Sequence, residues 1–292
     1  MSEQASSRRQ GISISIHSQI TMLSNFALHQ PQTRRRHTAT TTPTANSTRA
    51  QWIGFVGKLS LEKGVHCLIA AAPEIIRRVP QARFVLIGDG VARAHLVLMR
   101  DALATGDLDT AAEAMRRAAQ SSPEPYAEWV AEYWANLDFD AYRTHAIAAH
   151  LQESVLFTGY QTPLQVAQLV KHADLLVIPS LIKEAFPLVS VEALASGVMF
   201  VAPYTGGLSP ILDRVARELD GVGPLARIDH RPRRMIPEMI DHVCELLKHT
   251  ADADRRGHLA RSCRQFALRH FDWTNIVSRI ESVYVSALYG HV

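Results

Sequence analysis

Two glutamates stand eight positions apart in a stretch that otherwise carries little charge. Residues 179–197 read PSLIKEAFPLVSVEALASG, and Glu192 is the only charged residue within 185–202. A carboxylate in so apolar a run is costly unless it is paired or hydrogen-bonded, which makes Glu184 and Glu192 candidate site residues. A helix that begins near Pro187 would direct its free N–H groups at a ligand beside Glu184, and such an end favours an anion such as phosphate. The alternative is that each glutamate caps a helix or lies on the surface.

Two lysines follow the apolar run at residues 53–56. Gly57 ends this run, and Lys58 and Lys63 come within the next six residues. Lysine binds phosphate as a point charge, so two lysines at the end of a buried strand suit a diphosphate. Two solvated surface lysines would give the same pattern. The glycine pair at 206–207 follows a later apolar run and is a further candidate for a turn that faces phosphate.

The elements that must position these residues begin at Trp52, where short apolar runs start to alternate with stretches of helical spacing. The apolar runs predict strands at Ile53–Val56, Phe84–Ile87, Val155–Phe157, Leu175–Ile178 and Met199–Ala202. The stretches between and after them predict helices at 64–78, 91–104, 163–172, 188–196 and 209–219. Nearly all-apolar strands that alternate with helices indicate an α/β fold with a doubly wound parallel sheet. Such sheets bind ligands at the carboxyl ends of their strands, where the lysines and glutamates would meet.

Additional helices are expected outside this alternation. The chain between the second and third strands is longer than one crossover needs, and it predicts a helical insertion at about 101–153 with helices at 106–120, 124–136 and 138–152. Its aromatic side chains are expected in the core; they are Tyr126, Trp129, Tyr133 and Trp134. Three helices at 237–249, 253–270 and 273–288 are predicted to end the chain.

The last of these helices carries an apolar stripe at helical spacing. The stripe consists of Trp273, Ile276, Val277, Ile280, Tyr284 and Leu288. It either packs on its own domain or, if it is left exposed, marks an interface with another domain.

Composition excludes several classes of protein. The chain has 292 residues, of which 47% are hydrophobic and 20% charged, as in an ordinary globular protein. No apolar run is long enough for a membrane helix, so we expect no integral membrane segment. The three cysteines stand far apart, in neither a disulfide framework nor a zinc spacing, which predicts a reducing, cytoplasmic location and no metal.

The first fifty residues differ from the remainder in charge. They hold six of the 31 basic and one of the 28 acidic residues, which leaves 25 basic and 27 acidic residues for the rest. The net charge of +3 therefore comes from residues 1–50, and no nucleic-acid partner is indicated. This Ser-, Thr- and Arg-rich segment predicts a disordered, low-complexity tail. An organelle transit peptide, or a twin-arginine signal at Ser7-Arg8-Arg9, is the alternative.

In combination, these stretches resemble the C-terminal, donor-binding half of GT-B glycosyltransferases of family 4. The similarity covers residues 52–290, and the matching pieces occur in the family's order. They are Gly57-Lys58, Glu62-Lys63-Gly64, Val85-Leu-Ile-Gly-Asp-Gly90, Val155-Leu-Phe-Thr-Gly159, Ala173-Asp-Leu-Leu-Val-Ile-Pro-Ser180, Glu184 with Glu192, and Gly206-Gly207. The resemblance implies a donor-binding domain at 51–290 that uses a nucleotide-diphosphate sugar and transfers its hexosyl group with retention, without metal or cofactor.

The resemblance also implies a role for each matching position. Lys58, Lys63 and Glu184 would be the catalytic residues, with the lysines on the diphosphate and Glu184 on the sugar hydroxyls. Glu192 would hold the ribose hydroxyls. The backbone would contribute the remaining donor contacts, through Gly57, Thr158, Gly159, Tyr160, Ala185, Phe186, Pro187, Leu188 and Val189.

Four departures from the family's pattern set limits to this interpretation. The family's Glu-Gly-Phe-Gly is Glu184-Ala-Phe-Pro187 here, and Pro187 has no N–H to donate. The acid that usually follows the Gly-Gly turn is replaced near Ser209-Pro210, and the helical insertion is atypical. Only about fifty residues precede the donor half, so the acceptor domain is expected from a partner chain, unless the sequence is truncated. A non-catalytic nucleotide-sugar-binding module, or an interaction protein with a vestigial cleft, is the alternative.

Overall fold

The structure is a computed structural model that describes residues 49–120, 124–219 and 221–289. The chain divides between Ser47 and Thr48, and the described residues belong to the unit after this division. The predicted tail lies outside the described residues apart from Arg49 and Ala50. Arg49 forms a close ion pair with the buried carboxylate of Asp174, so the folded unit begins at or before this arginine.

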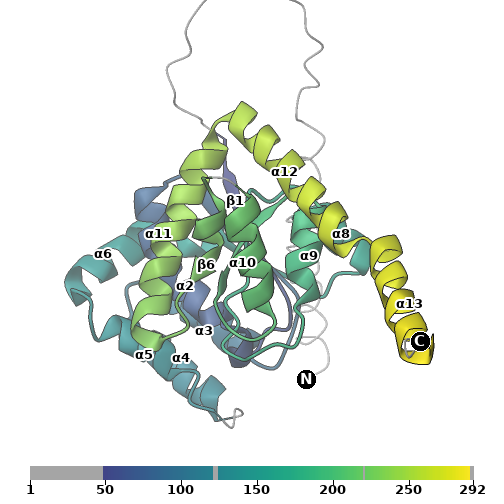
Figure 1. The fold of residues 1–292 in the computed structure, drawn as a ribbon. Helices are drawn as coiled ribbons and strands as arrows, with labels where there is room; N and C mark the ends of the chain where they lie inside the picture. The colour runs from purple at the N-terminus through teal and green to yellow at the C-terminus, as the bar shows by residue number, and fades with distance from the viewer. Residues whose placement is uncertain (1–48, 121–123, 220, 290–292) are drawn as a thin grey trace, which may run out of the picture. The chain divides into compact units, whose positions relative to one another are not determined.

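The described residues contain a six-stranded parallel sheet with the strand order β3-β2-β1-β4-β5-β6 (Figure 1). The strands are β1 (Gln51–Val56), β2 (Ala82–Ile87), β3 (Val155–Gly159), β4 (Leu175–Val177), β5 (Met199–Pro203) and β6 (Arg227–Ile228). The α/β prediction is confirmed, and all five predicted strands are present. Prediction missed β6 because this strand is two residues long and only Ile228 is buried, which leaves no apolar run to detect.

Helices follow the strands in the predicted alternation. Those directly after β1 to β5 are α2 (Val65–Arg78), α3 (Arg93–Ala104), α8 (Pro163–Val170), α9 (Leu188–Ala195) and α10 (Leu208–Glu218), with a short 3-10 turn η1 (Leu61–Lys63) before α2 and another, η2 (Gly223–Ala226), before β6. Right-handed crossovers place α2 and α3 on one face of the sheet and α8, α9 and α10 on the other. The core lies on both sides of the sheet, where Ile53, Phe84 and Phe200 are fully buried.

The helical insertion is built into the same core. It consists of α4 (Leu108–Ala119), α5 (Glu128–Trp134), α6 (Phe139–Ala148) and α7 (Leu151–Ser154). Tyr133 and Trp134 are buried as predicted, while Tyr126 and Trp129 are half-buried against the core. The prediction of one helix at 138–152 is wrong, because His150 takes a left-handed conformation with φ 45° and ends the helical path.

The C-terminal helices are α11 (Pro232–Ala251), α12 (Ala253–Phe271) and α13 (Trp273–Tyr289). The predicted start of α11 at Pro237 is wrong. The helix begins five residues earlier, at Pro232, because proline is tolerated in the first turn of a helix. It continues through Pro237, which lies inside the helix. Helix α11 packs on α2, and α12 packs on α9. No helix of the described residues is long and apolar enough to cross a membrane.

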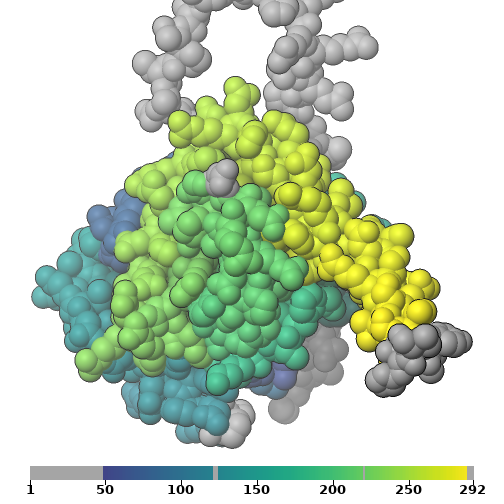
Figure 2. Space-filling view, viewed as in Figure 1, coloured from purple at the N-terminus to yellow at the C-terminus, as the bar shows by residue number. Residues whose placement is uncertain are grey.

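Helix α13 leaves most of its apolar stripe uncovered. Figure 2 shows α13, in yellow, extending along the side of the domain beyond α12. Trp273 is 74% exposed and Tyr284 is 65% exposed, whereas Ile276 is half-buried. Of the two alternatives for the stripe, packing against its own domain therefore does not hold for most of these side chains.

Candidate active site at the carboxyl ends of the strands

Three loops meet where β1, β4 and β5 end. We call residues 57–64 the lysine loop and residues 178–187 the acid loop. The N–H of Leu181 in the acid loop donates to Glu62 O in the lysine loop at 2.9 Å. The N–H of Gly207, after β5, donates to Glu184 O at 2.7 Å. Backbone hydrogen bonds thus join the two loops that contain the predicted catalytic residues to each other and to the Gly206–Gly207 turn.

Two glycines make this close approach geometrically feasible. Gly64 has φ 69°, and a Cβ atom at this position would lie 1.7 Å from Pro179 O in the acid loop. A Cβ atom on Gly207 would lie 1.9 Å from Ala185 O. Any side chain at either position would therefore force the loops apart, which explains why the sequence has glycine there.

Lys63 and Glu184 are brought into contact by this arrangement. The Lys63 Nζ atom lies 3.1 Å from Glu184 Oε1, and the side chains are 28% and 18% exposed, so water reaches the pair only in part. Lys58 is placed differently: its side chain is 58% exposed and its Nζ atom lies 4.0 Å from Glu62 Oε1. The site thus has one partly shielded lysine–glutamate pair, and a second lysine at its solvent-facing side.

Glu192 and Tyr160 line a single cavity of about 510 Å³. Glu192 comes from α9 and Tyr160 follows β3, while Val56 at the end of β1 contributes to the wall between them. Glu192 is exposed, and its carboxylate has no hydrogen bond or ion pair within the described part of the chain. The expectation that this acid is paired or hydrogen-bonded within the chain is not met, and the alternative of a surface glutamate holds for Glu192. The helix turns its carboxylate outward, where it is free to accept bonds from a ligand.

The acid loop continues directly into α9. Pro187 is the N-cap residue, with extended backbone, and no side chain caps the helix. Phe186 and Leu188 are 49% and 62% exposed. Val189 is half-buried. The first turn of α9 therefore lies open beside the loop that carries Ala185 and Glu184, as an anion site requires.

Other predicted donor contacts are already engaged within the sheet. The Gly57 N–H donates to Ile87 O at 3.0 Å. The Thr158 side chain is buried, and its hydroxyl lies 3.1 Å from Gly159 O. Gly159 O in turn accepts the N–H of Gly88. Of the three predicted donor contacts at Thr158, Gly159 and Tyr160, only Tyr160, which is 75% exposed, lines the cavity.

Sequence analysis missed several residues near the site. The remaining lining residues of the cavity are Gln161, Pro163, Val166, Ala167, Val170, Ala195 and Ser196. Their nearness in sequence to Tyr160 and Glu192 was the available signal. Two buried hydroxyls, of Ser60 in the lysine loop and Ser180 in the acid loop, have no hydrogen-bond partner among the described residues. No sequence pattern distinguishes these two serines.

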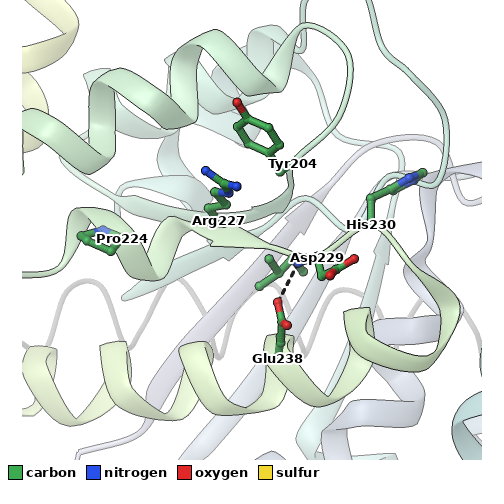
Figure 3. A pocket seen from close by; sticks show the side chains of 7 residues that line it. Tyr204, Pro224, Arg227, Asp229, His230 and Glu238 are labelled. Carbon is green, nitrogen blue, oxygen red and sulfur yellow. Dashed lines mark hydrogen bonds between the residues drawn. The ribbon is translucent and has the colours of Figure 1, made fainter.

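A larger cavity of about 650 Å³ lies at the β6 edge (Figure 3). Its charged side chains already have partners within the described residues. Glu238 Oε2 accepts the N–H of Asp229 at 2.8 Å, Asp229 forms a close ion pair with Arg231, and the Arg227 guanidinium lies 3.8 Å from the centroid of the Tyr204 ring. We therefore place the candidate active site at the acid and lysine loops.

The described residues contain no group of three or more His, Cys, Asp or Glu side chains that could hold a metal ion. The electrostatics of the site thus come from the Lys63–Glu184 pair, the second lysine and the open end of α9. The three cysteines are buried and free, and desolvation raises the pKa of Cys244 to about 11, so this thiol is not nucleophilic at neutral pH.

Part of the chain matches a known protein family. Residues 136–214, which include the acid loop, α9 and the Gly206–Gly207 turn, match the family model described as glycosyl transferases group 1. A glycogen synthase of Mycobacterium tuberculosis is 26% identical over 81% of this chain and 42% of its own length. A D-inositol 3-phosphate glycosyltransferase of Salinispora tropica is 34% identical over 50% of this chain and 27% of its own length.

Solved structures share the fold. The crystal structure of HepE from Anabaena in complex with UDP and glucose aligns with 82% of this chain and 49% of its own, at 20% identity and a TM-score of 0.50. The S. aureus TarM G117R mutant in complex with Fondaparinux, alpha-GlcNAc-glycerol and UDP aligns with 88% of this chain and 41% of its own, at 14% identity and a TM-score of 0.52. The chain thus spans less than half the length of these proteins. Residues 136–214 thus resemble glycosyl transferases group 1, and the described residues share the GT-B fold of these solved structures.

Proposed function

We propose that this domain binds a nucleotide-diphosphate sugar and is the donor half of a retaining glycosyltransferase. The observation that carries the proposal is the contact between Lys63 and Glu184, 3.1 Å apart, at the carboxyl ends of β1 and β4. This edge is where open parallel sheets bind their ligands. One relative of this chain is named a D-inositol 3-phosphate glycosyltransferase, and the HepE structure holds UDP and glucose.

In the proposed reaction, cleavage of the bond between the sugar and the diphosphate leaves negative charge on the departing group. The Lys63 ammonium group and the uncapped first turn of α9 would stabilise this charge. Glu184, now sharing Lys63 with the diphosphate, would accept hydrogen bonds from sugar hydroxyls. Both groups are fixed before the donor arrives, so little reorganisation is needed during the reaction.

The nucleoside would occupy the cavity lined by Tyr160 and Glu192. The base can stack on the exposed Tyr160 ring. The unpaired Glu192 carboxylate would accept hydrogen bonds from the two ribose hydroxyls. A cavity of about 510 Å³ falls within the range usual for small-molecule sites. The Gly57 N–H and the Thr158 hydroxyl already form hydrogen bonds within the sheet. We therefore assign the contacts with the base to Tyr160 and its neighbours.

The acceptor would be bound by a further domain, which a partner chain or a longer form of this chain would supply. Two observations support this. The chain spans 42% of the length of the mycobacterial glycogen synthase. The exposed apolar side chains of α13, such as Trp273 and Tyr284, form a surface that a second domain would cover. The three buried free cysteines support a cytoplasmic, reducing location, which we retain as part of the proposal.

A non-catalytic nucleotide-sugar-binding module is the second candidate. Pro187 favours it, because its ring removes one N–H from the entrance of α9, where the reaction needs donors. The two candidates share donor binding and differ in turnover. Sugar transfer in the presence of an acceptor domain separates them.

Donor binding is tested by calorimetry with UDP-, GDP- and ADP-glucose on the wild-type protein and on Glu192→Ala. We expect micromolar to millimolar binding of one donor and about 10-fold weaker binding by the variant, because ribose loses a charged acceptor. Glu245→Ala is the matched control. This glutamate also lies exposed on a helix, and its partner is Lys248. Absence of binding by the wild-type protein, or equal loss in both variants, would refute the proposed site.

A further inference from the structure

His230 connects the edge strand β6 to the acid loop. It lies two residues after β6, and its Nε2 atom is 3.1 Å from Leu181 O. A carbonyl oxygen can only accept a hydrogen bond, so Nε2 carries the proton. His230 also lines the β6-edge cavity, where Figure 3 shows its ring directed away from Glu238. The His230 side chain is thus committed to the acid loop.

This bond completes the restraint of the acid loop. The Leu181 N–H already donates to Glu62 O, so both backbone groups of Leu181 are held from opposite sides. Three residues further on, Glu184 O accepts the N–H of Gly207. The short segment between Leu181 and Glu184 is therefore fixed at both ends. That fixes the direction in which the Glu184 carboxylate leaves the loop.

The inserted helices hold His230 in this position. The Trp129 ring, on α5, lies 5.1 Å from the His230 ring, centroid to centroid, with the planes inclined at 50°. Glu132, one turn further along α5, forms a close ion pair with Arg233 at the start of α11. An aromatic contact at His230 and an ion pair at Arg233 thus join α5 to the segment between β6 and α11 and to the first turn of α11.

The insertion also contacts the other side of the site. The Nε2 atom of His66, in the first turn of α2 directly after the lysine loop, lies 2.9 Å from Tyr126 O. Tyr126 precedes α5 by two residues. The segment around α5 therefore touches the element after the lysine loop and the residue that anchors the acid loop. No feature of the sheet requires this segment, since one crossover would suffice between β2 and β3.

We propose that His230 is a positioning residue, which fixes the acid loop so that Glu184 meets the sugar of the donor, and that α5 acts through Trp129 to hold His230 in place. This inference rests on the proposed function. It assigns the insertion a task at the site: the insertion supplies a rigid support for the acid loop from outside the sheet.

The positioning is tested without ligand by hydrogen exchange of peptides that cover residues 181–187. His230→Phe keeps an aromatic ring for Trp129 but cannot donate a hydrogen bond to Leu181 O. We expect amide exchange in this loop to become about 5-fold faster, because one hydrogen bond that holds the loop closed is lost. His230→Gln can donate from a similar position and should restore the wild-type rate. His242→Phe is the matched control, since half-buried His242 bonds Leu225 O at 3.1 Å, remote from the acid loop.

The role in donor binding is tested by comparing the affinities for UDP-glucose and UDP. His230→Phe should reduce the preference for the sugar-bearing ligand about 5-fold and leave UDP binding unchanged, whereas a general loss of structure would weaken both. Trp129→Leu should change the ratio in the same direction. Unchanged loop exchange in His230→Phe, or an equal effect of His242→Phe, would overturn the positioning role. If the wild-type protein binds neither UDP-glucose nor UDP, while GDP and ADP donors also fail, the proposed function falls, and the exchange result still decides whether His230 holds the loop.

Discussion

Replacement of Lys63 by alanine should remove most of the turnover while leaving the fold intact. The ammonium group lies 3.1 Å from Glu184 and is 28% exposed, so its charge is only partly screened by water. A preplaced donor that stabilises developing charge in such a setting contributes about 2.7–4 kcal/mol to transition-state stabilisation. We therefore expect Lys63→Ala to lower turnover by about 10²-fold or more.

Lys58→Ala provides the comparison within the same loop. Lys58 is 58% exposed and 4.0 Å from its only ion-pair partner in the described residues, Glu62. Exposed ion pairs contribute about 0–1 kcal/mol, because water screens their charges. A charge that is screened in this way should contribute equally little to turnover, so we expect Lys58→Ala to lower turnover by no more than about 5-fold. The difference between two lysines five positions apart thus tests the geometry rather than the net charge of the loop.

The assay measures release of the nucleotide diphosphate from the sugar donor that the wild-type protein binds, with an acceptor domain present. Thermal unfolding of each variant is recorded alongside, because Glu184, only 18% exposed, loses its partner in Lys63→Ala. That loss should cost about 1 kcal/mol or less in unfolding free energy, since the pair is partly solvated. Unchanged turnover in Lys63→Ala, or equal losses at both lysines, would refute the assignment of Lys63 to the leaving group.

Two further predictions concern stability. Gly64→Ala should lower the free energy of unfolding by about 3 kcal/mol, because the new Cβ atom would overlap Pro179 O and the backbone has φ 69°. Gly257→Ala, inside α12, should instead raise the free energy of unfolding by about 0.5–1 kcal/mol. Chemical denaturation measures both changes. Burial lowers the pKa of His66 from 6.5 to about 4, so the unfolded chain binds the proton more tightly than the folded one, and stability should fall by up to about 3 kcal/mol between pH 6.5 and 4. Denaturation curves of the wild-type protein and His66→Gln at pH 7 and 4.5 check this, and the same pH slope in both would contradict it.

The sequence alone predicted the parallel sheet because its strands are buried on both faces. Runs such as 84–87 and 199–202 are continuous apolar segments, and periodicity over a few neighbouring residues is enough to recognise them. The glycines and charged residues that end these strands were visible for the same reason, since each follows directly on a recognisable run. Elements without a local signal were missed: β6 is too short, and the break at His150 depends on one backbone angle.

Only the tertiary structure decided which of the candidate residues act together. Lys63 and Glu184 are 121 positions apart, and Trp129 and His230 are 101 apart, so no local pattern reports their contacts. The apolar neighbours of Glu192 in sequence left open whether its carboxylate is paired or lies on the surface, and the structure shows it exposed. Residues that are neighbours in sequence set the hydrophobic periodicity, and this periodicity decides whether a segment forms a helix or a strand. Which face of an element is covered, and by what, depends on the packing of segments that meet only once the sheet has formed.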